Sequence, residues 1–240
     1  MDDWLKESNE VEPSWLTVDL AIFTVRGDQL MVLLVERGVE PFLGCPALPG
    51  GYVQKDETLR RGALRELWEE AGIDGSRLHL EQLGAYADPG RDPRGRVVTV
   101  AFLALGPDLP VPVGGTDAER AYWAPVRELF EGEVELAFDH AVILADALEE
   151  IRRKLEYTAV ATAFCGEEFT LSELRAVYEV IWGQALDPSN FRRKVLRTTG
   201  FLEPTGKQRL PPTGRPAAVY RRGSSWLLSL PLLRTGGPTG

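Results

Sequence analysis

Short, nearly continuous apolar runs mark the first part of the chain as strand-forming. Residues 16–25 and 30–36 are rich in Val, Ile and Leu, and the turn-forming segment 26–29 separates them. This pattern predicts two strands joined as a hairpin. Residues 97–105 (VVTVAFLAL) predict another buried strand, which follows the turn-rich segment 88–96 (DPGRDPRGR).

Other segments place their apolar residues at helical spacing. Residues 137–154 have this period and end in three consecutive basic residues, which favours a helix that ends at this cluster. A second helical segment lies within residues 51–73. Strands and helices together predict a mixed α/β domain over residues 15–154.

Two short helices joined by a tight turn are predicted farther along the chain. Thr170 and Glu173 match a capping box, and the apolar spacing after them continues to Trp182, where Gly183 ends the helix. Asp187 is a second N-cap, followed by Pro188 at the first helical position.

The second of these helices has one apolar face and one cationic face. Phe191 and Val195 lie within about 40° of each other around the helix axis, whereas Arg193, Lys194 and Arg197 lie on the other side. Residues 200–222 follow as a basic segment punctuated by Gly and Pro, which suits a β-hairpin. A helix-turn-helix with a hairpin wing over residues 155–222 is therefore predicted.

Charge separates the two parts of the chain. The net charge of the 240 residues is −9, yet residues 155–240 hold 11 Lys and Arg against 7 Asp and Glu. The segment from Asn190 to the end has Glu203 as its single acid and a net charge of +9. Such a basic second part is typical of nucleic-acid binding, and the acidic first part points to a different partner.

Composition excludes several classes of protein. Hydrophobic residues make up 44% of the chain, which suffices for a packed core, but no run approaches the roughly 20 apolar residues of a membrane span. Cys45 and Cys165 have neither metal-type spacing nor a disulfide pattern, and His79 and His140 fit ordinary hydrogen-bonding roles better than catalytic ones. With an acidic N-terminus in place of a signal peptide, we expect a cytoplasmic protein.

Residues 51–73 (GYVQKDETLRRGALRELWEEAGI) place three carboxylates on one short helix. At about 100° per residue, Glu66, Glu69 and Glu70 fall within roughly 100° of one another, beside an apolar stripe that can pack on a sheet. Oxygen-only ligands favour Mg²⁺, with Mn²⁺ next, and the preceding Gly50-Gly51 loop lets backbone approach metal or phosphate. The simpler interpretation of this pattern is a solvated acidic helix face.

This segment resembles the signature of Nudix hydrolases at all of its fixed positions. The resemblance implies an α+β fold with a Nudix α/β/α sandwich and a mixed sheet. It also implies that Glu66, Glu69, Glu70 and the Gly51 carbonyl would hold the metals, that Arg65 would brace the carboxylates, and that Glu57 would orient Arg65. The RDPRG turn is similar to one in ADP-ribose-specific Nudix proteins, although a plain solvated loop explains it equally well.

The basic helix and hairpin predict contacts with duplex DNA. In a helix-turn-helix the second helix enters the major groove while basic flanks hold the phosphates. Residues placed to make such contacts are Thr170, Ser189, Asn190, Arg192, Arg193, Lys194, Arg197, Lys207 and Arg209. A small helical domain with a solvated basic surface is the alternative.

Residues 15–222 as a whole resemble the Nudix-related transcriptional regulators of NAD metabolism, the NrtR family. The resemblance implies a homodimeric repressor that senses ADP-ribose or a related nucleotide and binds operator DNA. Because the signature is intact, a working Mg²⁺-dependent ADP-ribose pyrophosphatase is the second hypothesis, and the two are compatible. Residues 1–14 are expected to be an N-terminal tail, and the tail over residues 223–240 is either a docked extension or disordered.

Overall fold

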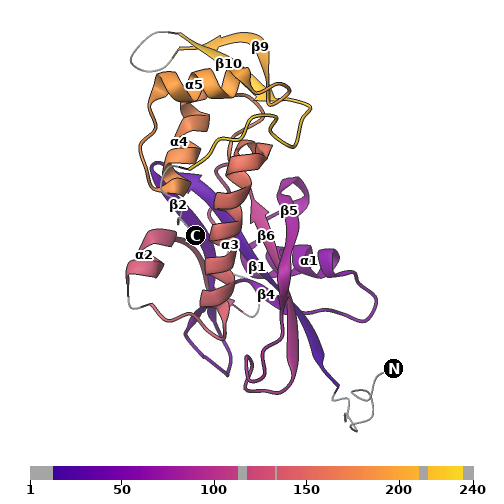
Figure 1. Ribbon diagram of the computed structural model, residues 1–240. Coiled ribbons are helices and arrows are strands. Elements are labelled where there is room, and N and C mark those ends of the chain that lie inside the picture. Colours follow the sequence, from indigo (N-terminus) through magenta and orange to yellow (C-terminus); the bar gives the residue numbers. More distant parts are fainter. Residues whose placement is uncertain (1–12, 113–117, 133, 211–215, 235–240) are drawn as a thin grey trace, which may run out of the picture.

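The computed structural model describes residues 13–112, 118–132, 134–210 and 216–234. It has two parts joined by one long helix (Figure 1). The first part contains a seven-stranded sheet, and the second contains two helices and a three-stranded sheet.

The predicted hairpin forms the centre of the large sheet. Strand β1 (Trp15–Arg26) pairs antiparallel with β2 (Gln29–Arg37) and parallel with β6 (Val97–Leu105). Both the hairpin and the later strand are confirmed, and the sheet is mixed as expected. The other strands of this sheet are β3 (Pro46–Ala47), β4 (Gly50–Tyr52), β5 (His79–Tyr86) and β7 (Ala118–Pro125).

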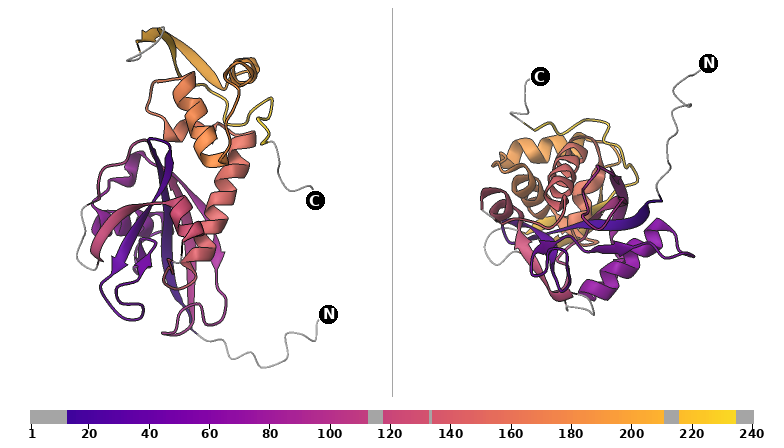
Figure 2. Two further views of the ribbon diagram at one scale, coloured as in Figure 1. Left: turned by 90° about the vertical axis from the view of Figure 1, so that its left-hand side faces the viewer. Right: turned by 90° about the horizontal axis from the view of Figure 1, so that it is seen from below.

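Both faces of this sheet are buried, which explains why its strands are apolar at consecutive positions. Val18, Leu20 and Ile22 of β1 pack under helix α1 (Leu59–Ala71). Phe23 belongs to the core on the opposite face, beneath helix α3 (His140–Tyr157). Figure 2 shows α1 and α3 on opposite sides of the strands, so the predicted α/β/α sandwich is confirmed.

Helix α3 begins and ends three residues later than the pattern predicted. Ala137 is fully buried before the helix starts, and the amide of His140 donates to its carbonyl. At the other end the helix continues because Leu155 is fully buried in the core. The basic residues 152–154 do not end the helix; they form ion pairs with acids, among them Glu149 and Glu150. A short helix, α2 (Val126–Glu131), precedes α3.

The second part has the predicted winged-helix elements. Helix α4 (Leu171–Trp182) starts with the Thr170–Glu173 capping box and ends at Gly183, whose φ is 68°. Helix α5 (Pro188–Arg197) starts at the Asp187 cap. The wing strands β9 (Leu202–Arg209) and β10 (Ala217–Arg222) form a sheet with the short strand β8 (Phe169–Thr170) in the order β8-β10-β9.

The two parts share a continuous apolar core. Ile151 and Leu155 of α3 belong to the same buried cluster as Tyr178 of α4 and Phe191 of α5. The short 3-10 helix η3 (Ala159–Phe164) connects α3 to the winged helix and is itself mostly buried. The predicted division at residue 155 falls inside α3, and it remains a prediction.

The C-terminal segment to residue 234 is docked on the protein. Leu228 and Leu232 are buried, and their amides donate to the carbonyls of Tyr157 and Glu156. Trp226 stacks on His79 with ring centroids 5.2 Å apart. The docked alternative therefore holds for residues 223–234. Across the ranges that the structure describes, no helix combines the length and apolarity needed to cross a membrane.

Candidate functional site

A polar cavity of about 460 Å³ lies beside strands β1, β2, β3 and β4 of the large sheet. Strand β1, the β3–β4 loop, α1, the segment after β5 and the start of α3 all contribute to it. Its charged lining residues are Asp19, Glu36, Arg37, Arg65, Glu66, Glu69, Glu70, Arg91, Asp92 and Arg94. The acidic patch predicted on α1 therefore faces a concavity.

The three carboxylates occupy different environments within this cavity. Glu70 accepts a hydrogen bond from the Gly50 amide at 3.0 Å, and burial raises its pKa to about 8. Burial also raises the pKa of Glu66, whereas the Glu69 carboxylate is partly exposed. The charged forms of Glu66 and Glu70 are thus disfavoured by desolvation unless a cation accompanies them.

Arg65 connects the carboxylates of the signature. Its Nη1 lies 2.7 Å from Glu66 Oε1 and 2.8 Å from Glu69 Oε2, and its Nη2 lies 2.6 Å from Glu57 Oε1. Nη2 also donates to the Tyr52 carbonyl at 3.0 Å. The hydrogen bond from Arg65 lowers the pKa of Glu57. The resemblance implied that Arg65 braces the carboxylates and that Glu57 orients Arg65; these contacts support those roles, which stay a prediction.

The glycines of the preceding loop leave no room for a side chain. A Cβ on Gly51 would lie 2.3 Å from Glu66 Oε1, and a Cβ on Gly50 would lie 2.4 Å from Asp19 Oδ1 and 2.3 Å from the Val18 carbonyl oxygen. The backbone of β4 therefore runs directly against two acidic side chains. Glycine is required here because of this close approach.

The chemistry of the donors suits a hard divalent cation. Two partly desolvated carboxylates, a third at the cavity rim and backbone carbonyls give an oxygen-only set. Within the described part of the chain, however, no three acidic, His or Cys side chains converge as metal ligands. The reason is visible in the contacts, since Glu66 and Glu69 are both turned to Arg65.

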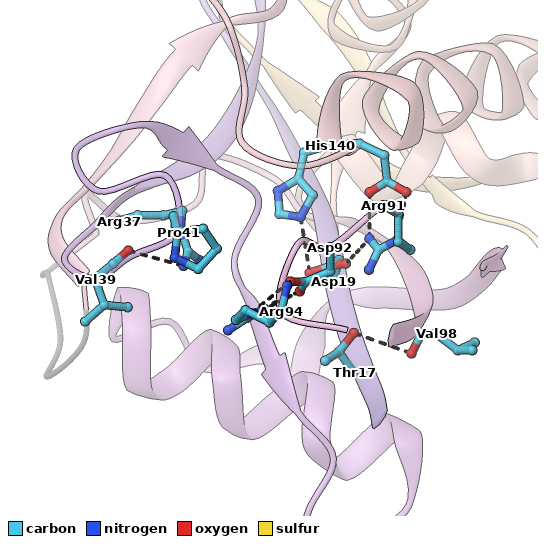
Figure 3. Close-up of polar contacts among 11 residues, drawn as sticks. Thr17, Asp19, Arg37, Val39, Pro41, Arg91, Asp92, Arg94, Val98 and His140 are labelled. Carbon is cyan, nitrogen blue, oxygen red and sulfur yellow. Dashed lines mark hydrogen bonds and ion pairs between the residues drawn. The ribbon is translucent and has the colours of Figure 1, made fainter. Parts of the chain in front are cut away.

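The wall opposite α1 carries residues to which the sequence analysis assigned no catalytic or metal-binding role. Figure 3 shows His140 and Arg91 converging on Asp19, at 3.6 Å and 3.5 Å. Arg91 also forms a bidentate pair with Asp139 at 2.6 and 2.8 Å, and its side chain is only 4% exposed. The RDPRG turn is therefore part of the cavity rather than a solvated loop.

His140 has the hydrogen-bonding role expected for it. Its Nδ1 accepts from the Leu48 amide at 2.9 Å, and burial lowers its pKa. The one sequence feature that indicates this wall is Asp19, a lone acid inside the apolar strand β1. A buried charge needs partners, so other polar groups must lie beside it. Its partners lie far away in sequence, so the pattern alone does not give them.

Aromatic and guanidinium groups form the rest of the lining. Arg94 lies over both Tyr52 and Phe138, each at 5.5 Å from the ring centroid, and Arg37 lies 4.7 Å over Phe138. Arg94 is held by Asp92, with 2.6 Å between Nη2 and Oδ2. The cavity thus offers cationic and flat apolar groups beside the acidic helix, as binding of a nucleotide diphosphate requires.

A second charged surface lies on the winged helix. On α5, Phe191 and Val195 are buried as predicted. Ser189, Asn190, Arg192, Arg193, Lys194 and Arg197 are all exposed. Figure 1 shows α5 and strands β9 and β10 at the end of the molecule opposite the start of β1, and these exposed α5 side chains are accessible to a partner.

Three residues predicted to contact DNA are engaged elsewhere in this structure. The Thr170 side chain is buried and caps α4. Lys207 lies 2.7 Å from Glu168, and Arg209 lies 2.6 Å from Glu173. The wing is thereby attached to the start of α4. The Lys207 side chain is 65% exposed and the Arg209 side chain 47%, and their contacts with DNA stay a prediction.

Fold and site together define a Nudix domain followed by a winged-helix domain. Residues 15–147 match the NUDIX domain family, and residues 161–222 match the family described as the NrtR DNA-binding winged helix domain. The chain belongs to the NrtR family, because it also aligns with a member over most of both lengths. That relative, from Acinetobacter baylyi, is named "ADPR responsive transcriptional repressor NtrR" and is 36% identical over 86% of this chain and 81% of its own length.

Solved structures agree with this assignment. Shewanella oneidensis NrtR in complex with a 27mer DNA matches with a TM-score of 0.76 and 33% identity, over 91% of this chain and 99% of that one. The Nudix domain of the same protein in complex with ADP ribose matches with a TM-score of 0.52 and 32% identity, over 63% of this chain and 99% of that one.

Proposed function

We propose that this protein is a transcriptional repressor that binds operator DNA through its winged helix and responds to ADP-ribose in the Nudix cavity. The single observation that carries the proposal is the pairing of two sites in one folded chain. A polar cavity of nucleotide size lies in the first domain, and an exposed cationic helix lies in the second. A hydrolase alone has no use for the second site.

The DNA-binding part of the proposal is supported by the geometry of α5. Its buried residues Phe191 and Val195 fix the helix on α4, which presents the opposite face outward. Arg193, Lys194 and Arg197 on that exposed face would contact phosphates and base edges in the major groove. Lys207 and Arg209 would contact the flanking backbone from the wing. Two such modules in a homodimer would match a palindromic operator.

The ligand part is supported by the charges and rings of the cavity. Arg37, Arg91 and Arg94 would bind the diphosphate, and the rings of Tyr52 and Phe138 would flank the base or a ribose. The genes of NAD metabolism are the expected targets, because ADP-ribose is a product of NAD breakdown. A repressor of this kind would act in the cytoplasm.

A divalent cation, Mg²⁺ or Mn²⁺, is part of the proposal. Glu66, Glu69, Glu70 and the Gly51 carbonyl would hold it, and once bound it would neutralise diphosphate charge and activate water. Arg65 would release Glu66 and Glu69 toward it while remaining bound to Glu57.

The intact signature favours a second activity, the Mg²⁺-dependent cleavage of ADP-ribose to AMP and ribose 5-phosphate. Here Glu57 and Arg65 would orient the carboxylates, and Glu70 would be the residue most sensitive to substitution. Release of AMP should therefore be lost in Glu70→Gln. Equal release by this variant and the natural protein would contradict the assignment of Glu70 to the metal.

The repressor proposal is tested by direct binding. Duplexes are selected with the protein from a randomised library, and fragments upstream of NAD-synthesis genes are assayed in parallel by fluorescence anisotropy. We expect salt-sensitive binding that ADP-ribose changes. An Arg193→Gln, Lys194→Gln variant should lose affinity, whereas Arg127→Gln on α2 should not, because that exposed residue lies in the other domain. Selection of no duplex would refute the proposal.

A further inference from the structure

Helix α3 touches both sites that the proposed function requires. It has 18 residues and therefore spans about 27 Å. Figure 1 shows it running from the Nudix domain to the winged helix, and its first residue, His140, lines the cavity. Its N-terminal end is bonded to side chains of the cavity wall, and its C-terminal part is bonded to helix α4 of the winged helix.

The N-terminal end of α3 is held by the cavity wall. Its N-cap residue, Asp139, forms the bidentate pair with Arg91, and its first residue, His140, accepts the Leu48 amide. Arg91, Leu48 and His140 all line the cavity, whereas Asp139 stands behind Arg91. The start of α3 therefore lines the cavity through His140 and is bonded to a second lining residue, Arg91, through Asp139.

The C-terminal end of α3 is held by the winged helix. The Arg152 guanidinium donates to the Ile181 carbonyl at 3.2 Å, and the Trp182 indole donates to the Arg152 carbonyl at 3.4 Å. Both partners belong to the last turn of α4, directly before its Gly183 cap. A shift of α3 along its axis would therefore move α4, against which α5 packs.

Between these ends α3 is a continuous, packed helix. One face, which includes Ile143, Leu144 and Ile151, is buried along its whole length. The docked C-terminal segment adds backbone hydrogen bonds to Glu156 and Tyr157. Such an element moves as a unit, because bending it would break main-chain hydrogen bonds or open the core.

We propose that α3 transmits the ligand signal, with Asp139 and Arg152 as the positioning residues at its two ends. This inference rests on the proposed function. A diphosphate in the cavity would compete for Arg91, which Asp139 and Asp19 share in this structure. Loss of the Arg91 pair would free the start of α3, and the Arg152–Ile181 and Trp182–Arg152 hydrogen bonds would carry the displacement to the winged helix.

The test measures coupling rather than binding alone. The coupling factor is the ratio of DNA affinities without and with saturating ADP-ribose, for a duplex selected by the protein. Asp139→Asn removes the charge partner of Arg91, and Arg152→Met keeps the aliphatic packing of the arginine but removes its donor. Asp146→Asn and Arg153→Met are matched controls on the same helix, since Asp146 is exposed and bonded to Tyr86 and Arg153 pairs with Glu150.

Asp139→Asn and Arg152→Met should each lower the coupling factor by about fivefold or more, within the usual range of allosteric coupling. The affinity of Arg152→Met for ADP-ribose, measured by calorimetry without DNA, should match that of the natural protein. Both controls should retain full coupling. A merely structural role would lower the melting temperature without this selective loss.

The outcomes separate the two proposals. If the natural protein binds DNA with the same affinity whether or not ADP-ribose is present, the proposed function fails. If the natural protein is coupled and Asp139→Asn and Arg152→Met are coupled to the same degree, the role of α3 is refuted while the proposed function stands.

Discussion

Replacement of Gly51 by alanine tests whether the close approach of β4 to the acidic helix holds the site together. The new Cβ would lie 2.3 Å from Glu66 Oε1, where an ordinary contact begins at 3.4 Å, so the carboxylate must move by about 1 Å. That shift breaks the 2.7 Å contact with Arg65 Nη1. A charge-assisted hydrogen bond contributes about 1.5–3 kcal/mol. Alanine also reduces the conformational entropy of the unfolded chain, which offsets about 0.4–1 kcal/mol of this loss in the free energy of unfolding.

A net loss of about 1.5 kcal/mol corresponds to a melting temperature lower by roughly 3–6 °C for a chain of this size. Differential scanning fluorimetry measures this shift, and calorimetry with ADP-ribose and Mg²⁺ should show weaker binding. Gly84→Ala is the matched control, since it also lies in a strand of the sheet and its Cβ would meet nothing closer than Tyr86 Cε2 at 3.8 Å. The reasoning is refuted if Gly51→Ala melts and binds like Gly84→Ala.

Three further predictions follow from other parts of the molecule. Phe191→Ala should lower the free energy of unfolding by about 3–5 kcal/mol in urea titrations, and Leu196→Ala, which is already 45% exposed, should change it little; equal effects would contradict the packing of α5. Lys194→Gln should reduce the slope of log affinity for DNA against log salt by about 1, whereas a slope equal to that of the natural protein would exclude a phosphate contact. Because burial lowers the pKa of His140 from 6.5, the unfolded chain takes up a proton below that pH while the folded one does not, so the free energy of unfolding should fall as the pH drops through 6.5. His140→Gln should show a smaller fall, and an unchanged pH dependence would mean that another group is responsible.

Local signals predicted the winged helix almost residue by residue. The Thr170 and Asp187 caps and Gly183 fix where α4 and α5 begin or end, and each depends on contacts within a few residues. The same holds for the carboxylates of α1, whose common face follows from helix geometry alone. These features are readable because the interacting groups are neighbours in the sequence.

The predicted bounds of α3 were wrong because they depend on contacts with residues far away in the sequence. A basic cluster suggested the end of a helix, but Arg152 turns to α4, and Lys154 pairs with Glu81 of β5 at 3.1 Å. These partners lie far away in sequence, so tertiary packing overrode a local preference. The helix stops only at Thr158, whose hydroxyl donates to the Lys154 carbonyl.

Separation in the sequence also explains why the cavity wall opposite α1 could not be predicted. Asp19, Arg91 and Asp139 belong to three segments that only the folded sheet brings together. Asp19 lies in the central strand β1, which pairs with the parallel strand β6. Arg91 belongs to the turn that precedes β6, and the pairing places this turn beside Asp19. A buried acid in such a strand predicts that a cation must meet it, although not which one. In this structure Arg91 donates to Asp139 through Nε and Nη2, and the same Nη2 lies 3.5 Å from Asp19 Oδ2. On the proposed role of α3, a ligand diphosphate would compete with Asp139 for this guanidinium, and the charge of Asp139, just outside the cavity, would couple the ligand to the start of α3.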